Sequence, residues 1–356
     1  MNINIDFFSY LELEKIGIGA FAPLNGFMKE EDFYSVVDTM RLTSGKLFPL
    51  PVLLPIKNEV YNNIVLDSEV KLIFNKIKVG VLKIESKYKI DFQNHIIKLF
   101  GTEDIEHPGY KMLNSLGNFF VGGKIKFLNK VNNNLSKYEL VPEVVKKEIK
   151  NRNMQSVAGF QTRNVPHRAH EYILELALKD MDGLFVQPLI GRKRVGDFTP
   201  EAVMTSYKLL QGDFFPLNKM ILGALTTSMR YAGPREAVFH ALIRKNYGCT
   251  HFLVGRDHAG VGSYYGEYEA QNLCIKLEEE LGISIIKVRG PFYCNKCERI
   301  NIDTYCQHPE ERIPVSGTKI RNSLINGKEI SSRFMRPEIV KSLNNIEIFI
   351  KEDTDD

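Results

Sequence analysis

Between residues 154 and 289, short apolar runs alternate with longer stretches in which apolar residues recur every three or four positions. The short runs are typical of buried strands, and the longer stretches are typical of amphipathic helices. The predicted strands cover 154–160, 183–190, 220–227, 250–255 and 283–289, and the predicted helices cover 167–180, 199–211, 234–246 and 264–281. Thr199 is the expected N-cap of its helix. Strands that alternate with helices in this way predict an α/β fold with a Rossmann-like, doubly wound parallel sheet.

The pattern differs on both sides of this region. Before it, β-branched runs punctuated by Gly, Asn, Asp and Pro predict an antiparallel barrel or sandwich-like domain, with strands at 51–56, 70–74, 79–84 and 96–100. A polar, Asn-rich linker at 129–134 and a short helix at 141–150 follow. After residue 290 an irregular segment precedes two short helical stretches, 317–326 and 335–345. We therefore expect a β-rich domain with its linker at 1–150, a central α/β domain at 151–290 and a small C-terminal domain at 291–356.

Composition limits the classes of function. The chain has 356 residues, of which 44% are hydrophobic and 25% charged, so it is neither disordered nor fibrous. The net charge of +4 does not indicate a nucleic-acid or membrane surface. No apolar run approaches the roughly 18 residues that cross a bilayer, and the first residues lack the pattern of a signal peptide. Because five cysteines do not suit a disulfide framework, we expect a cytoplasmic protein.

The chemically distinctive residues follow the predicted strands. They form four loops, 161–164 (QTRN), 191–197 (GRKRVGD), 228–236 (SMRYAGPRE) and 255–262 (GRDHAGVG). In an open parallel sheet these loops meet at one edge, where ligands bind. Their cationic side chains suit a ligand with several phosphate or sulfate-like groups; they are Arg163, Arg192, Lys193, Arg194, Arg230, Arg235 and Arg256. Arg192–Arg194 also fit a solvated turn, Asp197 fits a helix cap, and Asp257 fits an ion pair with Arg256.

Two histidines stand out beside the QTRN loop. His167 and His170 lie three residues apart at the start of a predicted helix, so they share a face near the positive end of its dipole. There each can donate a hydrogen bond to a phosphate oxygen, although either alone would fit a surface position. We expect His240 and His251 to serve only the helix and strand that contain them, and His95 and His107 to lie at the surface.

The cysteines predict a second site. Cys294, Cys297, Cys306 and His308 have the spacing of a tetrahedral zinc shell, and a shell filled by protein ligands has a structural role. The alternative is a set of free thiols in an irregular loop. Cys249 and Cys274 are expected to be buried core thiols. The sequence contains no GxxxxGK[ST] loop, which disfavours a P-loop kinase, and no GxGxxG fingerprint of dinucleotide binding.

Together, QTRNVPHRAHE, GRKRVGDFTPEA, MRYAGPREAVFHALIRKNYGCTHFLVGRDHAG and VSGTKIR resemble the ATP sulfurylase family, within the HxGH nucleotidylyltransferase superfamily. The resemblance covers residues 154–326, and FAPLNGFM at 21–28 is similar to that family's leading PUA-like domain. It implies a Rossmann-like catalytic domain and, as in some members, a zinc ribbon. It also implies transfer of AMP from MgATP to sulfate, which gives adenosine 5′-phosphosulfate and pyrophosphate.

The resemblance also implies roles for individual residues. It makes Gln161, Arg163 and Ala259 sulfate contacts, and places Gln161, Thr162, Arg163, Asn164, Gly255, Arg256, Asp257 and His258 at the nucleotide. Catalysis would fall to Thr162, Arg163, Asn164, His167, His170 and Arg256. Val165-Pro166 departs from the order in many members, but the Asn-x-x-His-x-x-His spacing is intact. VRGP at 288–291 matches the family's nucleotide-contacting strand poorly and receives no role.

Sulfate is fully ionised at neutral pH, so its attack on ATP needs oriented cations and hydrogen-bond donors but no general base. We expect direct in-line attack with Mg²⁺ accompanying ATP, and a homodimer as the commonest assembly. Two alternatives remain open. One is an RNA-binding module, although the sequence lacks aromatics interleaved with basic residues. The other is an HxGH nucleotidylyltransferase with another acceptor, which QTRN and GRDHAG disfavour.

Overall fold

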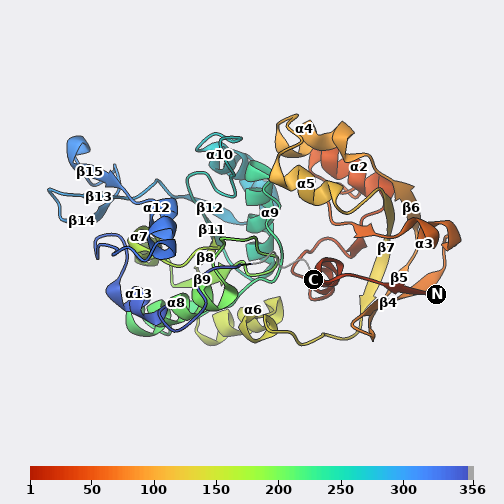
Figure 1. Cartoon of the computed structure of the whole chain (residues 1–356), viewed down its shortest axis with the longest axis horizontal. Helices are drawn as coiled ribbons and strands as arrows, with labels where there is room; N and C mark the ends of the chain where they lie inside the picture. Colours follow the sequence, from red (N-terminus) through yellow and green to blue (C-terminus); the bar gives the residue numbers. More distant parts are fainter. Residues whose placement is uncertain (352–356) are drawn as a thin grey trace.

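The computed structural model describes residues 1–351, and Figure 1 shows the N-terminal lobe, the central parallel sheet and a small extension beyond it. The central sheet has the strand order β10-β9-β8-β11-β12, and its neighbouring strands all run parallel. Its strands are β8 (Val157–Thr162), β9 (Gly183–Pro188), β10 (Met220–Leu222), β11 (His251–Val254) and β12 (Ser284–Lys287). The sequence prediction of a five-stranded parallel sheet is therefore confirmed.

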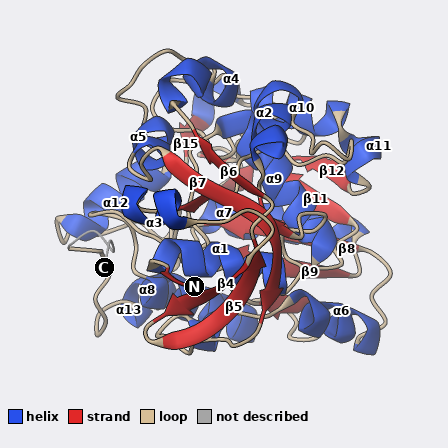
Figure 2. Cartoon of the chain, turned by 90° about the vertical axis from the view of Figure 1, so that its right-hand side faces the viewer, coloured by secondary structure: helices blue, strands red, loops and turns tan. Residues whose placement is uncertain are grey.

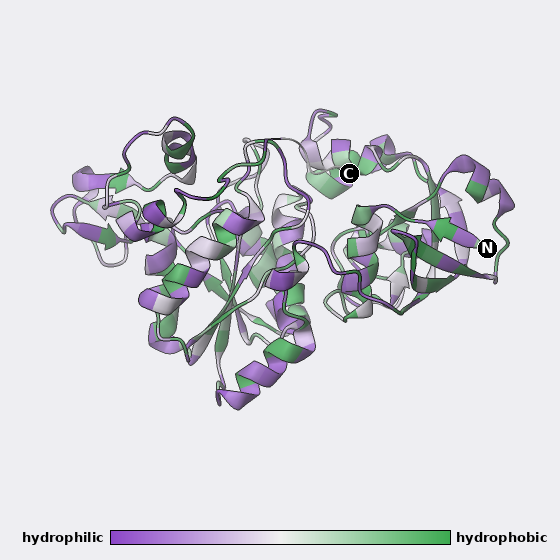
Figure 3. Cartoon of the chain, turned by 60° about the horizontal axis from the view of Figure 1, so that its bottom comes forward, coloured by the Kyte–Doolittle hydropathy of each residue, from purple (hydrophilic) through white to green (hydrophobic). Residues whose placement is uncertain are grey.

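Helices cover both faces of this sheet. They are α7 (Arg168–Asp180), α8 (Pro200–Asp213), α9 (Gly233–Asn246), α10 (Glu269–Lys276) and α11 (Glu278–Leu281). On β9, Leu184 and Val186 join the core that contains residues of α7 and α8, whereas Phe185 joins the core that contains α9. Figure 3 shows the resulting pattern, with hydrophobic strands inside and hydrophilic helix surfaces outside. Thr199 caps α8 as expected, because its hydroxyl accepts the N–H of Ala202 at 3.1 Å.

The N-terminal lobe combines a sheet with short helices. Its sheet has the order β1-β4-β5-β7-β2, and β3 and β6 also pair with β7 (Figure 2). The strands are β1 (Asn2–Asn4), β2 (Gly26–Phe27), β3 (Leu54–Pro55), β4 (Glu69–Phe74), β5 (Ile77–Lys83), β6 (Ser86–Lys89) and β7 (Phe119–Phe127). The helices are α1 (Phe7–Gly17), α2 (Glu30–Thr39), α3 (Asn58–Asn63), α4 (Ile96–Phe100), α5 (Pro108–Asn114) and α6 (Pro142–Asn151), the last leading into the central sheet.

One predicted strand of this lobe is wrong. Residues 96–100 form α4, in which Ile96, Leu99 and Phe100 are buried and Ile97 is exposed. This i, i+3, i+4 burial is helical, and a five-residue apolar run does not by itself distinguish a helix from a strand. Helices α1 to α5 of this lobe were also not predicted, whereas the helix expected at 141–150 is confirmed as α6.

The N-terminal lobe and the central sheet share one core. The ring of Phe239 on α9 lies 5.0 Å from that of Phe21 and 5.6 Å from that of Phe48. Arg235, also on α9, donates to the carbonyl oxygens of Val36 and Val37 near the end of α2, at 3.1 and 2.7 Å. The lobe therefore packs directly against the α9 side of the sheet.

The C-terminal region adds a small antiparallel sheet in the order β14-β13-β15, made of β13 (Phe292–Cys294), β14 (Arg299–Asn301) and β15 (Arg312–Pro314). Two helices follow, α12 (Gly317–Ile325) and α13 (Pro337–Ser342), and α13 packs on α8. The last five residues of the expected 291–356 domain lie outside the described residues. Within residues 1–351, every helix is too short or too polar to span a membrane.

Candidate active site

A cleft of about 660 Å³ opens at the carboxyl ends of β8 and β11. The chain leaves β8 for β9 on one side and returns through β11 on the other, so the cleft lies where the strand order reverses. This is the position at which open α/β sheets bind ligands. The cleft brings together two of the loops picked out by sequence, 161–164 and 255–260, with the start of α7.

Every residue that was predicted to act in catalysis, nucleotide binding or sulfate binding lines this cleft. They are Gln161, Thr162, Arg163, Asn164, His167, His170, Gly255, Arg256, Asp257, His258 and Ala259. Their convergence follows from the parallel sheet, since His251 of β11 lies beside Ala158 of β8 and both strands end at the same edge.

His167 and His170 form a stacked pair. Their ring centroids are 3.8 Å apart and the rings are nearly parallel, at 12°. Burial lowers the pKa of His167 to about 4, and burial together with the neighbouring His167 lowers the pKa of His170 well below its usual value. Both rings are therefore neutral at pH 7. The Nδ1 atom of each ring is buried and lacks a hydrogen-bond partner within residues 1–351.

Two helix N-termini meet beside this pair. His167 is the N-cap residue of α7, and a Cβ added to Gly317 at the start of α12 would lie 3.8 Å from its Nε2. Ser316 caps α12 by accepting the N–H of Lys319 at 3.3 Å. Because helix N-termini carry partial positive charge, both favour an anion at this end of the cleft.

The QTRN loop is connected to the distant SGTKIR segment. Arg321 of that segment donates to Oδ1 of Asn164 at 2.7 Å, and the two residues are 157 positions apart. Asn164 also donates its backbone N–H to the hydroxyl of Thr162 at 3.2 Å. These contacts fix the orientation of the Asn164 amide.

Cationic side chains gather around Tyr231. The guanidinium carbon of Arg163 lies 5.6 Å from the centre of this ring, and that of Arg194 lies 4.5 Å from it. Lys193 is buried nearby, and burial lowers its pKa to about 8. A solvated turn at 192–194 therefore describes the exposed Arg194 but not Lys193.

The GRDH loop has a constrained backbone. Asp257 and Ala259 have φ angles of 52° and 58°, in the left-handed region that residues other than glycine rarely adopt. A Cβ on Gly260 would lie 1.7 Å from Oδ1 of Asp257, so any larger residue there would displace the Asp257 carboxylate. Arg256 pairs with Glu267 at 3.3 Å, and not with Asp257 as considered from the sequence; both partners are more than half exposed.

Two cations expected at the ligand have other roles. Arg230 is buried and its guanidinium pairs with Glu12 of α1 at 2.7 Å. Arg235 donates to carbonyl groups of the N-terminal lobe, as described above. Both therefore join the lobe to the sheet. His107 is also not at the surface, because it is completely buried and its Nδ1 accepts the N–H of Gly109 at 3.1 Å, whereas His95 is partly exposed.

Other residues of the cleft were not predicted. One wall consists of Val288–Phe292, with Arg312 and Val315 beyond it. VRGP was noticed in the sequence but received no role. Arg312 carried no signal because it lies outside the loops that follow the parallel strands.

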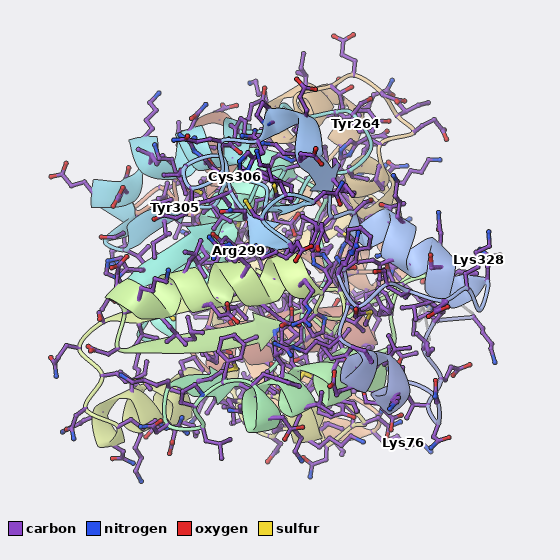
Figure 4. The ribbon with its side chains drawn as sticks, turned by 90° about the vertical axis from the view of Figure 1, so that its left-hand side faces the viewer. Lys76, Tyr264, Arg299, Tyr305, Cys306 and Lys328 are labelled. Atoms are coloured by element: carbon purple, nitrogen blue, oxygen red, sulfur yellow. The ribbon has the colours of Figure 1, made fainter. Side chains whose placement is uncertain are left out.

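The three cysteines and His308 converge at the end of the small sheet. Nδ1 of His308 lies 3.8 Å from Sγ of Cys294, 3.4 Å from that of Cys297 and 3.9 Å from that of Cys306. All four potential ligand atoms lie within 4.8 Å of one another. Zinc–sulfur bonds of about 2.3 Å in a tetrahedron require sulfur atoms about 3.8 Å apart. Cys297 and Cys306 are 3.9 Å apart, so this cluster can hold a metal ion. Figure 4 shows Cys306 near Arg299 and Tyr305, beside α7.

Comparisons with known proteins give a consistent result. The family model described as ATP-sulfurylase matches residues 136–346, and that of a PUA-like domain matches residues 1–130. The sulfate adenylyltransferase of Persephonella marina is 43% identical over 337 residues, which cover 93% of this chain and 87% of that protein. That of Pyrococcus abyssi is 38% identical over 347 residues, which cover 97% and 90%.

A solved structure shares the fold. The hexameric APS kinase from Thiobacillus denitrificans superposes with a TM-score of 0.75 at 18% identity. The match covers 96% of this chain but 62% of that longer chain. At this identity the likeness supports the fold only.

Proposed function

Because this chain belongs to the ATP-sulfurylase family, it is a sulfate adenylyltransferase, and we propose that its cleft joins MgATP and sulfate by direct in-line attack. A sulfate oxygen bonds to the α-phosphorus of ATP, and the bond from that phosphorus to the bridging oxygen of pyrophosphate breaks. The products are adenosine 5′-phosphosulfate and pyrophosphate, and the same site catalyses the reverse reaction. The convergence of Arg163, the histidine pair and the GRDH loop in one cleft is the observation that carries this mechanism.

The reaction brings two anions together, so the site has to offset their repulsion. Sulfate has no proton to lose, and a general base is not needed. Preorganised donors and cations that face the developing charge are the most effective catalysts of such a step. The two helix N-termini, Arg163 and the histidine pair that lines the cleft are groups of this kind.

Sulfate is assigned to Gln161, Arg163 and the backbone of Ala259. Arg163 supplies the charge, and its stacking on Tyr231 limits the conformations of the guanidinium. The left-handed conformation of Ala259 fixes the direction of the loop backbone. Because both loops belong to the rigid sheet edge, sulfate would be held at a set distance from the nucleotide.

The nucleotide is assigned to Thr162, Asn164 and the loop Gly255–His258. Arg256 would exchange its exposed partner Glu267 for a phosphate oxygen, which costs little because exposed ion pairs contribute at most about 1 kcal/mol. His167 and His170 are neutral and would each donate one N–H to the phosphates. Magnesium enters with ATP and offsets charge on its phosphate groups.

The second site is assigned to structural zinc. Cys294, Cys297, Cys306 and His308 would complete a tetrahedral shell without an open position, and such shells stabilise small folds. With the three antiparallel strands around them, they would form a zinc ribbon. We also expect a cytoplasmic homodimer that binds no nucleic acid.

One experiment tests the activity. The purified protein is incubated with MgATP and sulfate, and pyrophosphate is measured, with molybdate replacing sulfate in a parallel reaction. Pyrophosphate release that depends on either oxyanion supports the assignment. Salt-dependent RNA binding without this release would favour the RNA-binding alternative, and release with a different acceptor would favour another nucleotidylyltransferase.

A further inference from the structure

Beneath the GRDH loop, three side chains form a line from the core to the cleft. Nδ1 of His240 lies 3.1 Å from Nε2 of His258, which lines the cleft. Nε2 of His240 lies 3.5 Å from Oε1 of Glu236. Glu236 and His240 are fully buried on successive turns of α9 and do not themselves line the cleft. The sequence analysis gave His240 no chemical role.

Glu236 has a fixed position at the start of this line. Its Oε1 accepts the backbone N–H of Arg230 at 2.8 Å, and its Oε2 accepts that of Ala232 at 3.1 Å. Burial raises the pKa of Glu236 to about 7, so above that pH it is a carboxylate and offers only acceptors to its neighbours. Its negative charge then favours the proton of His240 on Nε2, which lies 3.5 Å from Oε1 of Glu236.

The remaining protons follow from the neutrality of the two rings. Burial lowers the pKa of His258 to about 3 and that of His240 well below its usual value. The other charged groups near them are Arg244 and Arg230, which disfavour a second positive charge. With its proton on Nε2, neutral His240 presents Nδ1 as an acceptor. His258 must then donate from Nε2, which leaves its own Nδ1 as an acceptor.

We propose that Glu236 and His240 are positioning residues that hold His258 as the Nε2–H tautomer, so that Nδ1 of His258 accepts a hydrogen bond from a hydroxyl or amino group of the nucleoside. This rests on the proposed function, because it takes the GRDH loop as the nucleotide site. A phosphate oxygen is itself an acceptor and would repel Nδ1. His258 therefore selects the nucleoside end of ATP, and the histidine pair on α7 serves the phosphates.

The tautomer is tested first without any ligand. Nitrogen-15 NMR of histidine-labelled protein distinguishes a protonated from an unprotonated ring nitrogen. Assignment of the His258 signals uses a His258→Asn variant. At about pH 8.5, where Glu236 is ionised, we expect Nδ1 of His258 to be unprotonated and Nε2 protonated. The opposite tautomer, or a rapid mixture of both, would overturn the proposal whatever the enzyme's substrates are.

A matched pair of variants then tests the role. His240→Asn keeps a polar group near the position of Nδ1, whereas His240→Phe keeps a ring without an acceptor. For His240→Phe we expect the KM for MgATP to rise about five- to tenfold, the KM for sulfate to change by less than about twofold, and the His258 signals to become those of a tautomer mixture. His240→Asn should recover most of the affinity and the single tautomer.

The outcomes separate the possible explanations. A purely structural role would change both KM values together, or lower the melting temperature without changing the His258 tautomer in the folded protein. Either result overturns the positioning role. If neither variant folds, the tautomer of the unmodified protein still decides. Absence of sulfate-dependent turnover in the unmodified enzyme would instead count against the proposed function.

Discussion

Replacement of Arg163 by alanine tests the charge-based mechanism most directly. The side chain is half-buried at the cleft, and its guanidinium carbon lies 5.6 Å from the ring centre of Tyr231. It follows β8 without belonging to a helix or to the apolar core. The variant should therefore fold normally and lose a cation that lines the cleft.

The expected size of each effect follows from these contacts. Loss of a cation–π contact at a partly exposed site costs about 0.5–1 kcal/mol of unfolding free energy. For a chain of this size, that lowers the melting temperature by a few degrees at most. Loss of one preorganised group that stabilises transition-state charge costs about 2.7–4 kcal/mol, which corresponds to a decrease in turnover of roughly a hundred- to a thousandfold.

The assay is sulfate-dependent release of pyrophosphate under saturating MgATP and sulfate, with melting temperatures measured on the same samples. Arg194→Ala is the matched control, because Arg194 lies over the same ring at 4.5 Å but is exposed. We expect the control to lose less than about tenfold in turnover, since it lacks an assigned substrate contact. Near-normal turnover of Arg163→Ala, or equal losses in both variants, would refute the reasoning.

Other parts of the structure give further predictions. His170→Ala should lower turnover by about a hundredfold or more in a folded protein, and near-normal turnover would remove its role. Metal analysis should find about one zinc per chain, and Cys297→Ser should reduce it; metal-free purified protein would refute the zinc site. Glu12→Ala leaves Arg230 buried without its partner and should cost about 3–5 kcal/mol in urea unfolding, whereas a loss below about 1 kcal/mol would contradict the ion pair's importance. The pKa of His167 is about 4 in the folded state and about 6.5 unfolded, so acid protonates the unfolded chain first. Unfolding free energy should therefore fall by roughly 3 kcal/mol between pH 6.5 and 4, and His167→Asn should remove that part of the decrease.

Much of the central sheet was predictable because most of its strands are buried on both faces. In β8, Val157–Phe160 is a continuous apolar run, and the helices between strands show a clear helical period. The N-terminal lobe was less predictable. Its short segment Ile96–Phe100 is compatible with either helix or strand, and only the packing of Ile96, Leu99 and Phe100 selects the helix.

The sequence could not separate ligand-facing cations from structural ones. Arg163 and Arg230 both follow strands of the same sheet, in loops rich in polar residues. Arg163 lines the cleft, whereas Arg230 is buried against Glu12, more than two hundred residues earlier in the chain. The partner of a buried charge depends on a long-range contact that leaves no local pattern.

The amino-acid sequence by itself determined the alternation of strands and helices, the loops at the sheet edge, the family and the metal-ligand spacing. These features are local, because each depends on the spacing of apolar residues along the chain or on a motif of a few residues. The tertiary structure alone decided which loops share the cleft, that Arg321 contacts Asn164, and that Glu236, His240 and His258 lie in one line. Such contacts depend on how distant or successive elements pack, because a side chain's protonation and direction are set by its neighbours in space.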